Sequence, residues 1–210
     1  MQPPPATLAR PSRLAGAPPG RRRRDQRLAG LLDAAAALFV EKGIAATSIE
    51  DIAERAGVAK GTFYHYFQDR AAMLEALRRR YSQRFADLVD AAMDACPRND
   101  WDGRLAAWVE ATVGEYLATY RLHDAIFHDP VVCERCVISE ETFVVSLAAL
   151  LQKAAAAGSW AIADPLTTAA FMFHGMHGLL DETIATNADT DVIKERIAGL
   201  FRQIVRPMPG

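Results

Sequence analysis

The sequence lacks a long hydrophobic run and has little cysteine. Charged residues or glycine interrupt every apolar stretch before it reaches the roughly 18–20 residues that a membrane-spanning helix needs. Three cysteines, an odd number, do not make a disulfide framework. The chain begins with proline, alanine and arginine rather than with the short apolar segment of a secretory signal. These absences predict a reduced, cytoplasmic protein with no membrane partner.

The chain also has little net charge, −2 from 24 basic and 26 acidic side chains. As a whole, that balance argues against a protein that simply coats nucleic acid. The charges are unevenly placed, however, because residues 1–70 carry 11 basic and 7 acidic side chains, whereas residues 71–210 carry 13 and 19. This asymmetry predicts an interaction surface at the basic, N-terminal end.

Sustained alternation of apolar and polar residues is missing too, which argues against a sheet. Apolar residues recur at spacings of three and four, and half of the chain is apolar, so an all-α protein with a sizeable core is expected. Capping and helix-breaking residues between the apolar segments predict helices at about residues 25–42, 48–56, 59–67, 69–95, 101–119, 121–128, 140–157, 165–187 and 190–205. Residues 1–20 hold six of the 11 prolines and no acidic group, so we expect a disordered tail over residues 1–24.

Two short helices joined at Ala56-Gly57-Val58 predict a helix-turn-helix. Thr47 and Glu50 have the spacing of a capping box for the first helix, and Gly57 suits a left-handed turn. The second helix would turn Lys60, Gly61, Thr62, Tyr64 and His65 outward near its N-terminus. Such modules insert that part of the helix into the major groove of DNA.

From Thr47 to Phe67, and again at Asp69-Arg70 and Leu74, the sequence resembles the tetracycline-repressor (TetR) family of bacterial transcription regulators. The family usually has lysine where Arg70 stands. The resemblance implies a helix-turn-helix DNA-binding domain at residues 25–70, followed at residues 71–210 by a larger helical domain for ligand binding and dimerisation. The resemblance implies no enzyme activity and no required cofactor. The partners it implies are double-stranded operator DNA, a small-molecule effector and a second copy of the chain. By the same analogy, the effector would shift the long helix that follows the recognition helix and release a repressor from a palindromic operator.

The expected DNA-binding residues combine the helix-turn-helix with the basic run before it, because an arginine arm can follow phosphates or enter a minor groove. They are Arg22, Arg23, Arg24, Thr47, Ser48, Lys60, Gly61, Thr62, Tyr64, His65 and Arg70. Two other interpretations remain open at this point. The turn could be a packing corner of a helical protein, and the arginine run could be a solvated tail.

Aromatic and polar residues on the later helices suggest an effector pocket, although a helical core would use similar residues. The candidates are Trp108, Tyr116, His123, Phe127, His128, Phe143, Phe171, His174, His177 and Asp181. On one helix, His174, His177 and Asp181 share a face, an arrangement that suits a divalent metal or a polar ligand group. The alternative is that these side chains form hydrogen bonds within the helical core or at a dimer interface.

The lone pair Cys133 and Cys136 allows a redox or zinc role, although ordinary cysteines at a helix junction explain it equally simply. A metal-dependent enzyme, or a regulator that senses metal or redox state through the C-terminal His, Asp and Cys residues, is the alternative function. No nucleophile–base pair or nucleotide-binding loop supports an enzyme.

The last two predicted helices carry features of a dimer surface. Gly175 and Gly178 permit close approach of a partner helix. An apolar stripe follows on the final helix and comprises Val192, Ile193, Ile197, Leu200, Phe201 and Ile204. Burial of this stripe within one chain is the alternative.

Overall fold

The structure, a computed structural model, describes residues 19–127, 137–186 and 188–205. Every regular element within these ranges is a helix, so the all-α prediction is confirmed. Most of the expected tail, His128, Cys133 and Cys136 lie outside the described residues. The helices are α1 (Pro19–Lys42), α2 (Ile49–Arg55), α3 (Lys60–Tyr64), α4 (Arg70–Asp94), α5 (Trp101–Phe127), α6 (Val137–Ala156), α7 (Pro165–Thr186) and α8 (Thr190–Ile204).

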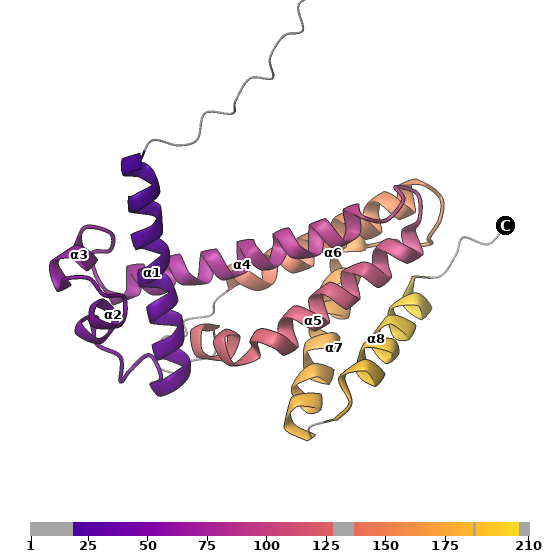
Figure 1. Ribbon diagram of the computed structural model, residues 1–210. Helices are drawn as coiled ribbons and strands as arrows, with labels where there is room; N and C mark the ends of the chain where they lie inside the picture. The colour runs from indigo at the N-terminus through magenta and orange to yellow at the C-terminus, as the bar shows by residue number, and fades with distance from the viewer. Residues whose placement is uncertain (1–18, 128–136, 187, 206–210) are drawn as a thin grey trace, which may run out of the picture.

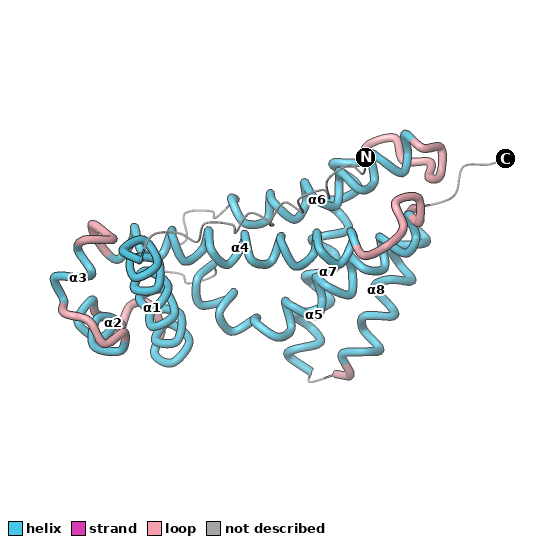
Figure 2. Tube along the Cα trace, turned by 45° about the horizontal axis from the view of Figure 1, so that its top comes forward, coloured by secondary structure: helices cyan, strands magenta, loops and turns pink. Residues whose placement is uncertain are grey.

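The first three helices form a small head at one end of the molecule, and α4 leads from it into a larger body (Figures 1 and 2). In the body, α4 packs mainly against α5, α6 against α7, and α8 against α5 and α7. A single cluster of buried apolar residues runs from Leu31 and Phe39 of α1 to Phe201 of α8. The head and the body therefore share one continuous core.

Helix α1 begins earlier than the sequence pattern predicts, at Pro19 rather than near Asp25. Proline suits a helix start, because the first amide groups have no partner within the helix. The helix then ends at Lys42, where Gly43 adopts a φ of 81°. The arginines at 21–24 thus lie in a helix and do not form a separate arm.

The cap of α2 differs from the expected Thr47–Glu50 pair by one residue. Ser48 is the N-cap: its hydroxyl accepts from the Asp51 amide at 3.1 Å, and the Asp51 carboxylate accepts from the Ser48 amide at 2.8 Å. The Thr47 side chain is buried instead and donates to the Gly43 carbonyl at 2.7 Å. The pattern contains two adjacent hydroxyl residues, and burial of the first leaves the second free to cap.

The corner between α2 and α3 forms as the sequence predicts. Gly57 has a φ of 66°, which strongly favours glycine. Ile52 and Phe63 are fully buried on either side of the corner, and Ala53 lies where the helices cross. Ile52 and Phe63 belong to the same buried core as Leu31 and Phe39 of α1, which holds the two helices of the corner in place.

The long helix α4 starts at an Asp69 cap, whose carboxylate accepts from the Ala72 amide at 2.8 Å. The next helix corrects a prediction, because α5 is continuous from Trp101 to Phe127 and is not split near residue 120. Tyr120 is partly buried against the core and no proline interrupts this stretch, so nothing ends the helix there. The boundaries of α6, α7 and α8 match the expected ones within about three residues. Across the described ranges, the helices fall short of the combined length and hydropathy required to cross a bilayer.

The Ser48–Asp51 cap leads to a stability prediction. Ser48→Ala removes the side-chain acceptor of the cap, so the free energy of unfolding should fall by about 1 kcal/mol. Glu50→Ala is the control, and it should change stability by less than about 0.5 kcal/mol because Glu50 is an exposed surface residue. Urea unfolding followed by circular dichroism measures both, and a larger loss in Glu50→Ala than in Ser48→Ala would restore the Thr47–Glu50 box.

Candidate nucleic-acid interface and polar core

The recognition helix α3 presents its polar side to solvent. Phe63 is fully buried and anchors the helix, while the Tyr64 ring meets the Phe63 ring edge-on with centroids 5.5 Å apart. Tyr64 nevertheless keeps 51% of its surface exposed. The remaining expected contact residues of this helix are exposed or half-buried and comprise Lys60, Gly61, Thr62 and His65. The anchored ring thus fixes which side chains face outward.

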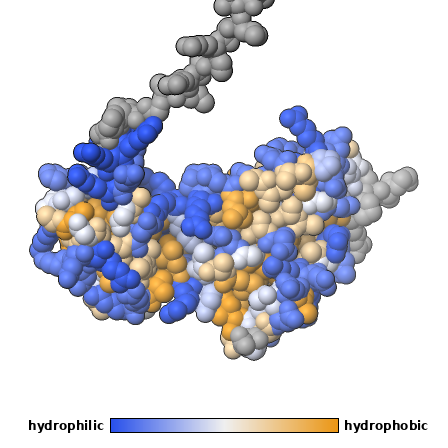
Figure 3. All heavy atoms as spheres, viewed as in Figure 1, coloured by the Kyte–Doolittle hydropathy of each residue, from blue (hydrophilic) through white to orange (hydrophobic). Residues whose placement is uncertain are grey.

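An arginine-rich hollow of about 630 Å³ lies where α1 meets α3. Three arginines line it from α1 and three polar residues from the α3 side: Arg23, Arg24, Arg27, Thr62, His65 and Tyr66. The Tyr66 hydroxyl donates to the Arg24 carbonyl at 3.3 Å, which joins the two sides. Figure 3 shows hydrophilic residues gathered over this end of α1. Arg22 is exposed on the same helix end. The structure therefore brings the basic run beside the recognition helix.

Four of the expected DNA-binding residues have partners within the head: Lys60, whose ion pair is described below, and Thr47, Ser48 and Arg70. The Arg70 guanidinium donates through Nη1 to the carbonyls of Ile44 and Thr47, each at 2.8 Å. Thr47 is 1% exposed, and Ser48 is engaged in the α2 cap. Arg70 and Thr47 thus position the helices, because their polar groups point inward. The positive charge of Arg70, which is all that the sequence gives, does not distinguish a residue that positions the helices from one that contacts phosphate.

Ion pairs cross the outer surface of the head. Lys60 contacts Glu50, Lys42 contacts Asp51 at 2.7 Å, and Arg55 contacts Glu41 at 2.6 Å. Hydrogen bonding to Glu50 raises the pKa of Lys60, so the ammonium stays charged. Exposed pairs of this kind contribute little free energy, so Lys60 can exchange Glu50 for another anion at low cost.

A second group of polar side chains meets in the body, where α5 packs against α7. The Tyr116 hydroxyl of α5 donates to Asp181 of α7 at 2.8 Å. The Tyr116 ring lies 4.8 Å from the His177 ring and 5.1 Å from the His123 ring, centroid to centroid. Burial and the Asp181 carboxylate both raise the pKa of Tyr116, so its hydroxyl remains a donor. These four residues, all candidates from the sequence, are called the polar core below: Tyr116 and His123 are buried, His177 is half-buried, and Asp181 reaches the surface.

Helix α4 supplies one wall of the polar core that the sequence analysis did not identify. The Tyr81 hydroxyl lies 2.9 Å from the Thr119 hydroxyl, and the Tyr81 ring lies 6.0 Å from His123. Burial raises the pKa of Tyr81 to about 12. Phe85 follows one turn later and packs against Phe143 at 4.4 Å. The four-residue spacing of Tyr81 and Phe85 indicates that they share one face of α4, but it does not indicate which helix that face meets.

The other candidate pocket residues separate into core and surface positions. Trp108 is fully buried against Phe201, and Phe127 and Phe143 are also buried. Phe171, by contrast, is 72% exposed in the single chain, so it does not join the buried candidates.

His174 is exposed too, and it does not join His177 and Asp181 in a metal-binding arrangement. Within the part of the chain that the structure describes, no group of three His, Cys, Asp or Glu residues has the geometry to hold a metal.

Comparison with known proteins identifies the head. The profile for "Bacterial regulatory proteins, tetR family" matches residues 31–77. The HTH-type transcriptional repressor KstR2 of Mycobacterium tuberculosis is 38% identical over 72 residues, which cover 32% of this chain and 36% of that protein. The chain thus matches about a third of the length of this curated relative.

Solved structures extend the fold comparison to most of the chain. The fatty acid degradation regulator FadR from Bacillus halodurans has a TM-score of 0.71 at 22% identity, over 83% of this chain and 94% of that one. A TetR-like transcriptional regulator from Rhodococcus has a TM-score of 0.64 at 19% identity, over 85% and 95%. Residues 31–77 thus match the tetR family of bacterial regulatory proteins, and the described helices as a whole share the fold of these solved structures.

Proposed function

We propose that the chain is a homodimeric transcriptional repressor that binds a palindromic operator and leaves it when a small molecule enters the body. The single observation that carries the proposal is the position of the arginine-rich hollow beside the exposed face of α3. One surface of the head thereby offers cations for phosphates and a short helix for the bases, while the acidic excess lies in residues 71–210.

The residues of α3 suit a helix that enters the major groove. Gly61 has no side chain, and a Cβ there would meet nothing within 4 Å, so its surroundings are open to DNA. Lys60 and Tyr64 are proposed to contact phosphates, and Thr62 can donate to a phosphate or meet a thymine methyl group. His65 and the arginines of α1 face the same hollow and would follow the adjoining backbone.

Exposed apolar residues on α7 and α8 support a dimer. The stripe expected on α8 divides into two faces: Ile193, Ile197 and Phe201 are buried within the chain, whereas Val192 and Leu200 are 62% and 41% exposed. On α7, Phe171 shares an exposed face with Gly175 and Gly178. A Cβ at either glycine would meet nothing within 4 Å in the single chain. Neither glycine is required for packing inside the chain, but both would permit a partner helix to approach closely.

The polar core is the proposed effector site, and α4 is the proposed link to the head. Arg78 of α4 donates through Nε to the Ile126 carbonyl at 2.6 Å, and its guanidinium carbon lies 5.7 Å from the centre of the Phe127 ring. Half a turn further on, Arg80 contacts Asp33 of α1 at 2.8 Å. A ligand that moves the end of α5 would thus move α4 and, with it, α1. Operator and effector must then favour different states by the same coupling free energy.

Salt dependence tests the DNA-binding proposal on duplexes from the region flanking the gene. Wild-type affinity should fall steeply with salt. Replacing Arg22, Arg23 and Arg24 with alanine should reduce the slope of log affinity against log salt by about 0.9 for each phosphate that the variant no longer neutralises. Arg79→Ala is the control, because Arg79 is 77% exposed on α4 and lies outside the hollow. Fluorescence anisotropy measures both. Binding that ignores salt, or an unchanged slope in the triple variant, contradicts the assignment.

Phe171→Glu tests the dimer face. A charge at this exposed position should dissociate the dimer and weaken operator binding by at least tenfold, since each head alone covers one half-site. Val145→Glu is the matched control, because Val145 is 56% exposed on α6. Sedimentation velocity should show a monomer for Phe171→Glu and a dimer for Val145→Glu. A dimer in both variants would place the interface elsewhere.

Arg78→Ala tests the link between the body and α4. Loss of a part-buried bond from a charged group should lower the free energy of unfolding by about 1.5–3 kcal/mol and weaken operator binding, because α4 loses its hold on the end of α5. Arg79→Ala should cost less than about 0.5 kcal/mol, since its pair with Glu75 is exposed. Equal unfolding energies for the two variants would remove Arg78 from the proposed link.

A further inference from the structure

A second hollow, of about 610 Å³, opens on the body where the turn between α4 and α5 faces α6. It lies at the end of α4 opposite the head (Figure 1). Its lining is Asp94, Arg98, Asn99, Trp101, Arg104 and Lys153. None of these residues belongs to the DNA interface or the polar core, so the proposed function leaves this hollow unexplained.

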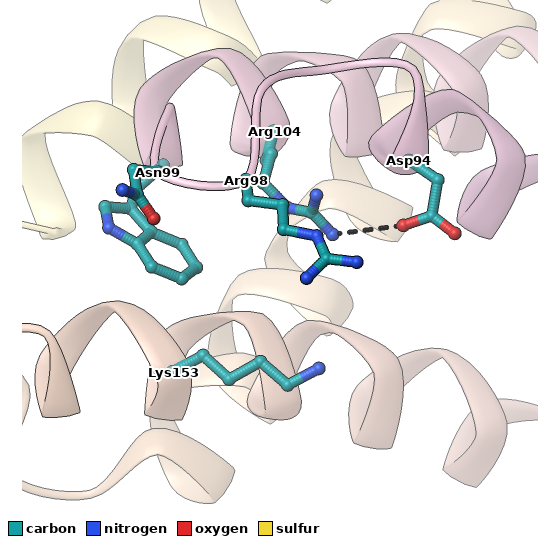
Figure 4. A pocket seen from close by; sticks show the side chains of 6 residues that line it. Asp94, Arg98, Asn99, Arg104 and Lys153 are labelled. Carbon is teal, nitrogen blue, oxygen red and sulfur yellow. Dashed lines mark hydrogen bonds and ion pairs between the residues drawn. The ribbon is translucent and has the colours of Figure 1, made fainter.

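Three cations and one carboxylate line this hollow. Arg104 contacts Asp94 through Nη2 at 3.4 Å, while its Nε atom is buried without a hydrogen-bond partner. Neither Arg98 nor Lys153 has an ion pair within the part of the chain that the structure describes. Figure 4 shows both arginine side chains above the ammonium end of Lys153, which comes from a different helix.

The neighbouring aspartate of the turn, Asp100, is not among the residues that line this hollow. Asp100 accepts from the Gly103 amide at 2.9 Å and so serves the start of α5. Asp94 neutralises one of the three cations, which leaves a formal charge of +2 on the lining. Like charges held near one another repel, and an anion between them would relieve that repulsion. Guanidinium groups prefer phosphate and carboxylate oxygens, which they contact through two parallel hydrogen bonds.

The aromatic ring and the size of the hollow narrow the chemical class of the anion. Trp101 lines it and is also packed against the hydrophobic core, which holds the indole in place. An indole held in this way offers a flat apolar surface for a ring to stack on. The volume is within the range of small-molecule sites and is much larger than a single inorganic ion requires. Asn99 adds an amide that can both donate and accept hydrogen bonds.

We propose that this hollow binds a nucleoside diphosphate, with the two phosphates at Arg98, Arg104 and Lys153 and the base on Trp101. The charge of +2 matches most of the charge of a diphosphate, and the site connects the far end of α4 to α6. This binding is separate from operator binding, so either proposal can fail without the other.

Isothermal titration calorimetry on the full chain tests the site, with ADP as the probe and adenosine and pyrophosphate as its two halves. ADP should bind at one site per chain, at least tenfold more tightly than either half, because the cations and the ring act together. In the double variant Arg98→Ala/Lys153→Ala, ADP affinity should fall by at least tenfold. Both side chains are exposed, so the variant should fold normally. Arg79→Ala should bind ADP like the wild type.

Tryptophan fluorescence locates the binding. Trp108 and Trp160 are 0% and 4% exposed, whereas Trp101 is half-buried at the hollow, so ADP should change the emission of Trp101. The change should disappear in Trp101→Phe. The proposal is overturned if the double variant binds ADP as tightly as the wild type, or if pyrophosphate or adenosine alone binds as tightly as ADP. It is also overturned if ADP still changes the tryptophan fluorescence of Trp101→Phe.

Discussion

The arrangement of the molecule depends on how the start of α4 is joined to the head. Arg70, the first residue of that helix, donates to carbonyls of Ile44 and Thr47 in the turn between α1 and α2. These carbonyls come just after the end of α1, where the helix cannot supply partners of its own. One guanidinium thus bridges two carbonyls of this turn, one of which also accepts from the Thr47 amide, and holds the turn against the start of the 25-residue helix α4. Together with the Arg80–Asp33 pair, this contact joins α4 to the head.

The sequence predicts the helices well because their boundaries are local. Gly43, Gly57 and Asp69 act within a few residues of their own positions, so their effect can be read without knowledge of the fold. The predicted break near residue 120 is wrong because no local signal ends the helix at that position. No proline or capping residue ends the helix there, and the packing of Tyr120 against the core carries it on to Phe127.

The candidate site was harder to predict, because the direction of a side chain is decided by the tertiary structure. Arg70 and Arg24 are the same residue type in the same basic N-terminal third of the chain, yet one is turned into the head and the other lines an open hollow. On α7, a spacing of three residues put His174 and His177 on one face, but His177 meets Tyr116 whereas His174 is exposed. The contribution of Tyr81 from α4 depends on which helices become neighbours, and no local pattern carries that information.

The pair between Lys60 and Glu50 has a kinetic consequence for the search along DNA. In the free head, the ammonium at the start of α3 already has a tethered carboxylate as its partner. In the proposed repressor, contact with a phosphate would exchange one anion for another, and the released carboxylate would stay nearby and repel the backbone. This cost would be the same at every sequence, whereas favourable base contacts would arise only at the operator. Residence on arbitrary DNA would be shortened as a result, and the protein would spend a larger share of its time moving between sites.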